Sequence, residues 1–399
     1  MKLLINRVLI VLTSLIRWLL LNRKLNNSRA QKRIVLIVFQ QIFGDSIVIS
    51  NSLKAYTQLF PNDKGYEIIF LARPSVMAFM KDTLILPEGI TFENLDFKKY
   101  LEDYRYFKSC NKQFKDKVDT LIVPGTSLSA EIFSVSCNAS RKVGLIRSID
   151  MKGSFLATLF SQIAYTETVR PNKSDMMLQR HRRLINYLGA TEYKAKLPVL
   201  LSKNKIIDED RYCVLCPGSS KMEKCWPTER FSQIVDYIVE QYDMTVHLCG
   251  GADEADFEKL IYSQVQYPER VISHIGKTNF SDWSAIVQHA DLVVGNDSAT
   301  MHLAAASRRK AICIAGVYDK YQFFPYKVDD LGSEDRLPNT IIKSMPCEWC
   351  RTIGYDAGFG NEECKKRIKA NKCALCIDSI TVKDVKMQIK IEMEGTSEK

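Results

Sequence analysis

From residue 33 onward, short apolar runs alternate with segments whose hydrophobic positions recur at helical spacing. The run 34–39 (IVLIVF) predicts a buried strand, and residues 45–60 predict the helix that follows it. The alternation restarts at residue 212, after a weakly periodic stretch, 189–210, that we interpret as a linker. Such alternation is typical of parallel sheets covered on both faces. The pattern therefore predicts an α/β protein of two Rossmann-like, doubly wound domains facing a cleft, with ligands at the carboxyl ends of the strands.

The same pattern predicts most other elements and the organisation of the chain. Further strands are expected at 66–71, 118–123, 142–145, 212–216, 244–249, 291–294 and 311–315, and further helices at 174–188, 227–242, 253–263, 280–289 and 298–307. We expect four parts: a basic amphipathic helix over 1–32, a Rossmann-like domain over 33–190, a second over 205–345, and a Cys-rich tail with a terminal helix over 346–399.

The net charge of +10 is concentrated at the N-terminus. Residues 1–33 hold eight basic residues and no acidic one, which leaves 48 basic and 46 acidic residues in the remainder. Binding to duplex nucleic acid requires a positive face on the folded domain. A nearly neutral body therefore argues against a nucleic-acid partner.

Residues 3–21 predict an amphipathic helix, because their polar and apolar side chains fall on opposite sectors at 100° per residue. The polar sector holds Asn6, Arg7, Thr13, Ser14 and Arg17, and the apolar sector holds Leu4, Val8, Val11, Leu12, Leu15, Trp18 and Leu19. We expect this helix to lie in the interface on the inner face of the cell membrane. The basic residues that follow it would reinforce the contact with anionic lipid: Arg23, Lys24, Arg29, Lys32 and Arg33. Two alternatives stay open, a helix packed on the protein's own surface and a single-pass anchor. The anchor would cost roughly 2.5–3.5 kcal/mol for each arginine near the bilayer centre.

The first loop of interest, residues 40–45, lies between the first strand and the first helix. Gly44 permits a sharp turn, and Asp45 then lies at a helix N-terminus that faces the expected cleft. An aspartate there either caps the helix or acts as a base in a dry site.

The second loop, residues 217–227, joins a strand to a helix that we expect to begin with Pro227. Its small hydroxyl and basic side chains include Ser219, Ser220 and Lys224. These residues predict a phosphate cradle, with a surface turn as the alternative.

Two further loops follow strands of the second domain. In residues 249–254, Glu254 could accept hydrogen bonds from ribose hydroxyls or only complement a helix dipole. In residues 295–302, a helix beginning near Ser298 offers a second anion site that Asp297 would orient. His302 is either part of this site or a structural histidine. Together the loops suggest a negatively charged nucleotide ligand.

The cysteines fall into two groups. Those within apolar runs, such as Cys213 and Cys313, indicate buried reduced thiols in a cytoplasmic protein. No small-residue cleavage site follows the N-terminal apolar stretch, so we expect no export. Near the C-terminus two CxxC pairs predict a structural zinc site, against packed thiols or a disulfide: Cys347, Cys350, Cys373 and Cys376.

Several motifs in this order resemble glycosyltransferase family 9, the ADP-heptose:lipopolysaccharide heptosyltransferases and their relatives. They are Gly-Asp at 44–45, Pro-Gly-Ser-Ser at 217–220 with Lys-x-Trp-Pro at 224–227, Gly-Gly-x-x-Glu at 250–254, Ile-Gly-Lys-Thr-Asn at 275–279, and Val-Gly-Asn-Asp-Ser-x-x-Met-His-Leu-Ala-Ala-Ala at 294–306. The resemblance covers about residues 33–330 and is most specific over 212–306.

The resemblance implies a GT-B fold and inverting transfer of a sugar from a nucleotide-diphosphate donor (ADP-heptose-like) without a catalytic metal. It implies an acceptor on a lipid-linked glycan such as the lipopolysaccharide core. In this resemblance Asp45 is the base, and the donor-binding residues are Ser219, Ser220, Lys224, Asp297, Ser298, Ala299, Thr300, Met301 and His302. Ala299-Thr300 stands where the family usually has Gly-Pro.

Two other functions remain open on the sequence alone. A nucleotide-sugar epimerase would use the same architecture without an acceptor. A non-catalytic nucleotide-sugar-binding protein would account for Ala299 in place of glycine. A zinc-ribbon nucleic-acid binder is disfavoured by the neutral body.

Overall fold

A computed structural model describes residues 2–23, 33–114, 118–125, 127–146, 163–172, 174–317, 322–347 and 362–395. The chain divides into two compact units. The first comprises Met1–Lys81 and Leu86–Ala195, and the second comprises Asp82–Ile85 and Lys196–Lys399.

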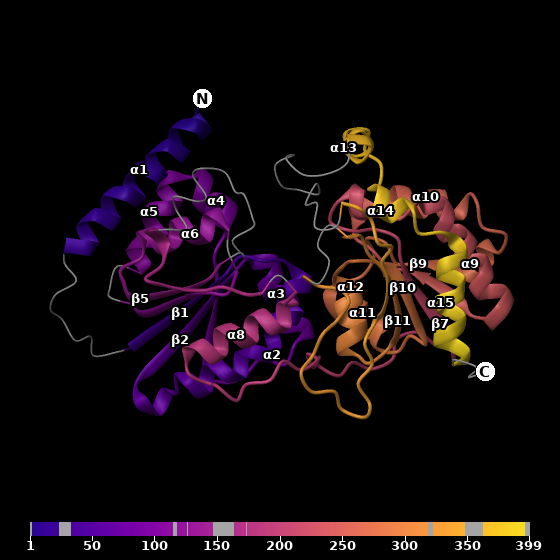
Figure 1. The fold of residues 1–399 in the computed structure, drawn as a ribbon, viewed down its shortest axis with the longest axis horizontal. Coiled ribbons are helices and arrows are strands. Elements are labelled where there is room, and N and C mark those ends of the chain that lie inside the picture. Colours follow the sequence, from indigo (N-terminus) through magenta and orange to yellow (C-terminus); the bar gives the residue numbers. More distant parts are fainter. Residues whose placement is uncertain are drawn as a thin grey trace. The chain divides into compact units, whose positions relative to one another are not determined.

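The first unit is built on a six-stranded parallel sheet of order β3-β2-β1-β4-β5-β6 (Figure 1). Its strands are β1 (Arg33–Phe39), β2 (Tyr66–Ala72), β3 (Ile90–Asn94), β4 (Val118–Val123), β5 (Ala139–Leu145) and β6 (Glu167–Val169). Residues 35–39 of β1 are all buried, as expected of a central parallel strand covered on both faces.

Helices cover both faces of this sheet (Figure 1). Besides α1, they are α2 (Phe43–Leu59), α3 (Pro74–Thr83), α4 (Phe97–Glu102), α5 (Tyr104–Gln113), α6 (Leu128–Ser136) and α8 (Met177–Leu188). Helices α2 and α8 pack against each other. Aromatic side chains of α4, α5 and α6 join Leu36 and Val38 of β1 in one apolar core.

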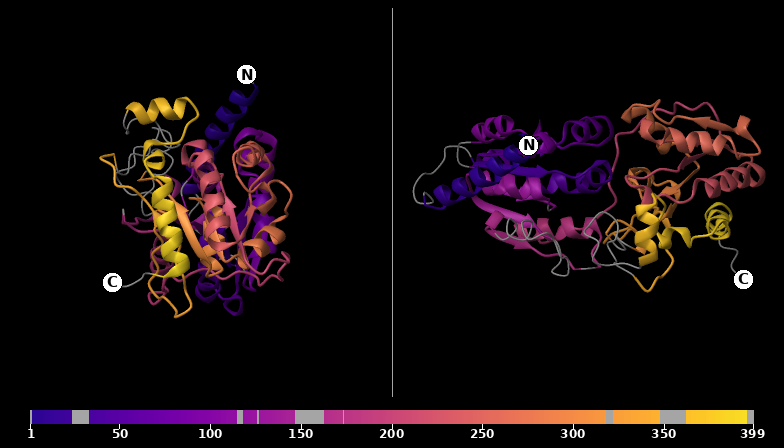
Figure 2. Two further views of the ribbon diagram at one scale, coloured as in Figure 1. Left: turned by 90° about the vertical axis from the view of Figure 1, so that its right-hand side faces the viewer. Right: turned by 90° about the horizontal axis from the view of Figure 1, so that it is seen from above.

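Helix α1 (Lys2–Arg23) packs on α4, α5 and α6 (Figures 1 and 2). The structure has the predicted helix, and it lies on the protein's own surface. Two basic residues of this helix contact the first unit. Arg7 pairs with Glu102 at 2.8 Å, and Arg17 donates to the Ser136 carbonyl at 3.0 Å. Polar groups of the first unit therefore hold the polar side of α1.

The second unit repeats the architecture, with a parallel sheet of order β12-β11-β10-β7-β8-β9. Its strands are β7 (Tyr212–Cys216), β8 (Thr245–Leu248), β9 (Val271–Ser273), β10 (Leu292–Asn296), β11 (Lys310–Ile314) and β12 (Asn339–Ile341). Its helices are α9 (Thr228–Tyr242), α10 (Ala255–Tyr262), α11 (Phe280–Gln288), α12 (Ala299–Ala306), α13 (Glu362–Lys369), α14 (Leu375–Asp378) and α15 (Val382–Glu394). Helix α15 lies beside α9 and β11 (Figure 2).

Both sheets have the strand order 3-2-1-4-5-6 when each is numbered from its own first strand. This order confirms the predicted fold class, two doubly wound Rossmann-like units of the GT-B type. The order reverses between β1 and β4 in one unit and between β7 and β10 in the other. Ligands of such sheets bind outside the carboxyl ends of the strands at this reversal, so the loops after these four strands locate the candidate sites.

Candidate functional site

In the second unit, the loops after β7 and β10 are bonded to each other through Asn296, the last residue of β10. The Asn296 side chain is fully buried. Its Nδ2 donates to the Pro217 carbonyl at 2.6 Å, and its Oδ1 accepts from the Trp226 N–H at 3.0 Å. Asn296 therefore holds both ends of the loop 217–227 against the end of β10. The sequence analysis missed it, although a polar residue that ends a buried apolar strand is a recognisable signal.

Three predicted donor-binding residues come together at this point. Ser219 Oγ donates to the Asp297 carbonyl at 3.0 Å, and Lys224 Nζ lies 3.6 Å from Asp297 Oδ2. The side chains of Lys224 and Asp297 are only 13% and 10% exposed, which keeps the ion pair largely out of water. Ser220, in contrast, is exposed. The structure thus gathers a hydroxyl, an ammonium and a carboxylate between the two loops.

The start of α12 lies in the same place. Ser298 is the N-cap residue, but its side chain makes no capping hydrogen bond. Its Oγ is buried and has no hydrogen-bond partner among the residues that the structure describes. An N-terminus without a side-chain cap leaves backbone N–H groups and a positive dipole end for an anion.

The residues of α12 that follow Ser298 are mostly buried. Ala299 is half-buried, whereas Thr300, Met301 and His302 are buried. His302 Nδ1 lies 2.5 Å from Tyr326 Oη, and burial lowers the pKa of His302 to about 4. The imidazole is therefore neutral and built into the core, as the structural alternative for His302 expects.

Glu254, which precedes α10, lies against two glycines. A Cβ atom added to Gly218 would stand 2.2 Å from Glu254 Oε1, and one added to Gly250 would stand 2.1 Å from Oε2. Both positions therefore require glycine if the carboxyl group is to stay where it is. Burial, reinforced by the negative charge of Asp253, raises the pKa of Glu254 to about 7. This carboxyl group lies beside the backbone of the 217–227 loop.

Residues 374–380 of the C-terminal segment form hydrogen bonds with the loop 217–227 and the start of α9. Trp226 Nε1 donates to the Ile380 carbonyl at 2.8 Å, and the Ala374 N–H donates to the Glu223 carbonyl at 3.0 Å. Arg230, in the first turn of α9, donates to the Asp378 carbonyl at 2.6 Å. The candidate phosphate loop is thus packed between β10 and the Cys-rich segment.

In the first unit, Asp45 is the third residue of α2, at the end of the loop that follows β1. It is half-buried, and its Oδ2 accepts a hydrogen bond from the Ile42 N–H at 3.4 Å. Such a long bond is a weak cap. Asp45 therefore caps α2 only through this weak bond, and its carboxylate lies near the carboxyl end of β1.

Two polar side chains that the sequence analysis did not assign share this end of the sheet. A Cβ added to Gly125, after β4, would stand 1.8 Å from Gln41 Nε2, so the amide lies directly over that glycine. Gln41 Oε1 and Arg73 Nε, the latter just after β2, are buried without a hydrogen-bond partner in the described part of the chain. Buried polar atoms of this kind usually meet water or a ligand.

The predicted zinc site is only partly within the described residues. Cys373 and Cys376 are buried in the apolar core of the second unit, Cys347 packs against it, and Cys350 lies outside the described residues. Burial raises the pKa of the Cys373 thiol. The described residues hold no group of three or more His, Cys, Asp or Glu side chains that could bind a metal. Because Cys350 lies outside the described residues, the structure does not test this site, and zinc stays a prediction.

Two Rossmann-like units with an anion-binding helix start at the second reversal point are typical of glycosyltransferases of the GT-B class. The profile of glycosyltransferase family 9 (heptosyltransferase) matches residues 109–348, more than half of the chain. The chain belongs to this family.

Comparison with individual proteins agrees with this assignment. The chain is 30% identical over 120 residues to lipopolysaccharide heptosyltransferase 3 of Escherichia coli K12 (30% of this chain, 34% of the relative). It is 24% identical over 225 residues to lipopolysaccharide core heptosyltransferase OpsX of Haemophilus influenzae (54% and 62%). The matched stretches thus span about a third and three fifths of these relatives.

Solved structures show the same fold. E. coli ADP-heptose lps heptosyltransferase II superposes with a TM-score of 0.63 at 14% identity, over 91% of this chain and 98% of that one. The iron-containing glycosyltransferase TibC of enterotoxigenic E. coli superposes with a TM-score of 0.52 at 13% identity, over 94% and 82%. At these identities the likeness concerns the fold, and the iron belongs to that protein.

Proposed function

We propose that this chain is an inverting glycosyltransferase that moves a heptose-like sugar from a nucleotide-diphosphate donor to a lipid-linked glycan. In this reaction an acceptor hydroxyl oxygen attacks the anomeric carbon while the bond from that carbon to the diphosphate oxygen breaks. The hydroxyl proton passes to a base, and the nucleoside diphosphate leaves with the bonding electron pair. The protein must therefore supply a base on one side of the sugar and stabilise negative charge on the other.

The observation that carries the proposal is the cluster at the end of β7 and β10. Lys224 and the Ser219 hydroxyl both contact Asp297, which directly precedes the uncapped start of α12 at Ser298. Preorganised N–H groups, a hydroxyl and an ammonium suit a diphosphate leaving group, and they do so without a catalytic metal.

The remaining donor-loop residues would act less directly. Asp297 would orient Lys224 through their ion pair. Since Thr300, Met301 and His302 are buried, their part is to hold α12 in place, while its backbone N–H groups face the phosphates. Ala299 in place of glycine adds one methyl group at the first turn, on a half-buried position.

Glu254 would accept hydrogen bonds from the ribose hydroxyls of the donor. Its carboxyl group lies beside Gly218 of the phosphate loop, within reach of a nucleoside whose phosphates occupy that loop. Only the ionised form accepts two hydroxyl donors, so ribose binding would draw this carboxyl group into its charged state.

In the first unit Asp45 would be the base, at the end of β1 where an acceptor would bind. The buried, unpartnered Gln41 Oε1 and Arg73 Nε at the same edge would contact polar groups of the acceptor. A guanidinium suits the phosphate or carboxylate groups that acidic glycans carry.

The identity of the sugar and acceptor comes from the relatives. Two of them are named for lipopolysaccharide and one for ADP-heptose. We assign this chain an ADP-heptose-like donor and a lipopolysaccharide-core acceptor, with the enzyme peripheral on the cytoplasmic face of the inner membrane. An acceptor carried by lipid explains why such an enzyme would keep a membrane-facing helix.

The proposal is tested by the Asp45→Asn variant in an assay of nucleotide release and glycan product. The amide keeps the shape of the side chain but cannot take the proton, so kcat should fall by at least roughly a hundredfold. Nucleotide affinity should stay unchanged because Asp45 belongs to the other unit. The matched control is Asp63→Asn, an exposed position of the same unit. Unchanged turnover would remove Asp45 from the mechanism, and epimerised donor without transfer would replace the proposal.

A further inference from the structure

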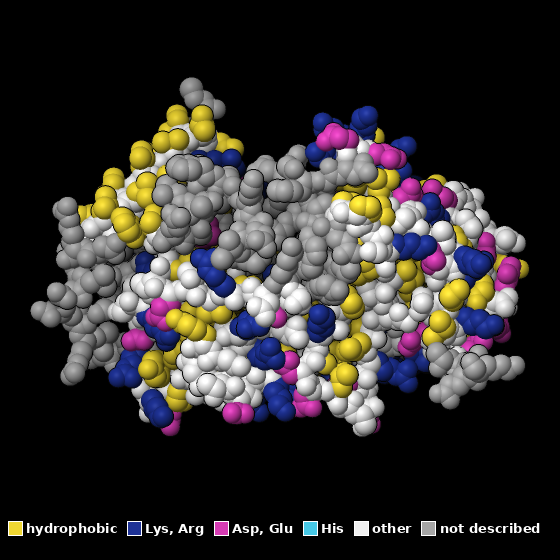
Figure 3. Space-filling view, viewed as in Figure 1, with side chains coloured by type: hydrophobic (Ala, Val, Ile, Leu, Met, Phe, Trp, Pro, Cys, Tyr) yellow, Lys and Arg dark blue, Asp and Glu magenta, His cyan; other side chains and the backbone are white. Residues whose placement is uncertain are grey.

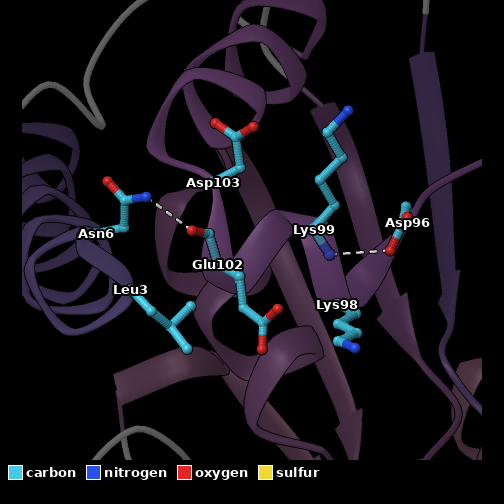
Figure 4. Close-up of a pocket in the computed structure, with 7 residues that line it drawn as sticks. All are labelled: Leu3, Asn6, Asp96, Lys98, Lys99, Glu102 and Asp103. Atoms are coloured by element: carbon cyan, nitrogen blue, oxygen red, sulfur yellow. Dashed lines mark hydrogen bonds between the residues drawn. The ribbon is translucent and has the colours of Figure 1, made fainter. Parts of the chain in front are cut away.

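Helix α1 is attached to the first unit by polar side chains and by a strip of apolar ones, in which Ile10 is buried and Val11, Leu15 and Trp18 pack against the core of that unit. Ser14 is fully buried and its Oγ accepts from Ser136 Oγ at 2.8 Å. Arg17 Nε donates to the Ser136 carbonyl, and Asn6 Nδ2 donates to the Glu102 carbonyl at 2.9 Å. Figure 4 shows the Asn6 contact at the rim of an open hollow of about 530 Å³ between α1 and α4. The helix is therefore docked by specific hydrogen bonds over several turns.

The opposite side of α1 is a continuous aliphatic ridge. Its members are between 38% and 67% exposed: Leu3, Leu4, Ile5, Val8, Leu9, Leu12, Ile16, Leu19 and Leu20. Figure 3 shows these hydrophobic side chains gathered along the helix. A surface helix normally buries its apolar side and exposes its polar side. Here a second group of apolar residues stays exposed beside those that pack on the unit, and a large exposed apolar patch marks an interaction surface.

The chemistry of the ridge points to lipid. It consists of Leu, Ile and Val side chains with no polar group that would align a protein partner. Residues 1–33 carry eight basic residues and no acidic one, which complements an anionic lipid surface. Two ridges packed together in a dimer would instead bring two such basic segments against each other.

The length and composition of Leu3–Leu20 would also allow this segment to cross a membrane. Crossing would require α1 to leave the first unit and break the bonds of Ser14, Arg17, Asn6 and Arg7. It would also move both arginines into hydrocarbon, where each is costly. The docked geometry favours a helix that lies along one leaflet.

We propose that the exposed ridge of α1 inserts into the acyl region of one leaflet of an anionic bilayer, while the polar contacts of α1 and its packed residues Ile10, Val11, Leu15 and Trp18 keep it docked on the first unit. This inference deepens the membrane-surface part of the proposed function by naming the inserting surface. It also sets the orientation of the first unit, because α1 covers α4, α5 and α6 and those helices then face the membrane.

The test is co-flotation of the full chain with phosphatidylcholine vesicles that contain about a quarter phosphatidylglycerol. The variant Leu12→Glu with Ile16→Glu places two charges on the ridge without touching buried groups, since both side chains are more than half exposed. We expect its floated fraction to fall at least roughly tenfold. The matched control, Leu331→Glu with Met387→Glu, changes equally exposed positions of the second unit and should float like the unmodified chain.

A milder variant, Leu4→Gln with Leu19→Gln, repeats the test with neutral side chains should the glutamates disturb folding, which circular dichroism detects. The inference is overturned if the ridge variants float like the unmodified chain. It is also overturned if, without vesicles, the unmodified chain forms oligomers and the ridge variants are monomers with no change in flotation. The ridge would then bind a second copy of the chain. Retention in membranes after alkaline carbonate extraction would indicate a spanning helix and overturn it too. Nucleotide binding, measured on the same samples, reports on the proposed transferase function independently.

Discussion

The buried carboxyl group of Glu254 gives the most quantitative prediction for the second unit. Its pKa is raised from 4.5 to about 7 by burial against Gly218 and Gly250 and by the charge of Asp253. Between these two pH values the folded protein keeps the proton while the unfolded chain has lost it. The folded state thus binds more protons there, so its stability falls as the pH rises from about 4.5 to about 7. Above pH 7 the full cost of the buried charge is present.

The magnitude follows from the size of the shift. At 1.36 kcal/mol per pKa unit, ionised Glu254 destabilises the second unit by about 3 kcal/mol relative to its protonated form. The variant Glu254→Gln resembles the protonated form at every pH. It should therefore match the unmodified chain at pH 4.5 and be more stable by about 3 kcal/mol at pH 8, as measured by urea unfolding.

The same carboxyl group should make nucleotide affinity rise with pH, whereas it makes the stability of the protein fall. If ribose hydroxyls donate to the ionised carboxylate, only about a tenth of the free protein is competent at pH 6, so the affinity should be about tenfold lower than at pH 8. Glu254→Gln should bind more weakly at pH 8 and lose this dependence. The control Asp256→Asn removes an exposed carboxylate of α10 and should keep this pH dependence, in calorimetric titrations at both pH values. A stability difference between Glu254→Gln and the unmodified chain that does not change with pH would refute the reasoning.

Further substitutions test the geometry of both units. Trp226→Phe removes the indole hydrogen bond to Ile380 and should cost about 1 kcal/mol in urea unfolding, with KM for the donor raised more than kcat is lowered; an unchanged KM would mean that the C-terminal segment does not position the loop. Gly125→Ala would displace the Gln41 amide, the far end of a flexible side chain, and should cost less than about 1 kcal/mol in urea unfolding; a larger loss would mean that the amide cannot move aside. Lys224→Gln should weaken nucleotide binding at least roughly tenfold, as measured by calorimetry, and equal affinity would exclude the lysine from the site. Metal analysis of the purified chain checks the predicted zinc, for which about one equivalent is expected.

Most strands of both sheets were predictable, because parallel strands buried on both faces are uniformly apolar. Most helices between them were predictable from the alternation with these strands. The strand at 34–39, the helix after it and the alternation from 212 to 315 all match elements of the structure. The short helices α4, α5 and α6 were not predicted, although the apolar positions of α5 do recur at helical spacing. Their boundaries depend on capping aspartates and serines, such as Asp103, which accepts from two N–H groups of α5.

The loops of the second unit were predictable because each directly follows a buried strand. The sequence could not show how they meet. The bond from Ser219 to Asp297, the bridging role of Asn296 and the packing of Glu254 on two glycines depend on which strands are neighbours in the sheet. The helix α1 was predicted, but its contacts with the first unit could not be, because the partners of Arg7 and Arg17 lie some hundred residues away in the chain.

The central claim is that the second unit binds a nucleoside diphosphate at the loops after β7 and β10. It is tested most directly by a thermal-shift panel of ADP, UDP, GDP and CDP on the full chain. A nucleotide at about a hundred times its Kd stabilises by roughly 2.7 kcal/mol, which raises the Tm of a domain of this size by roughly 5–10 °C. We predict one clear responder, ADP, with the shift lost in Lys224→Gln. No shift with any nucleotide, on protein shown to be folded, would contradict the account.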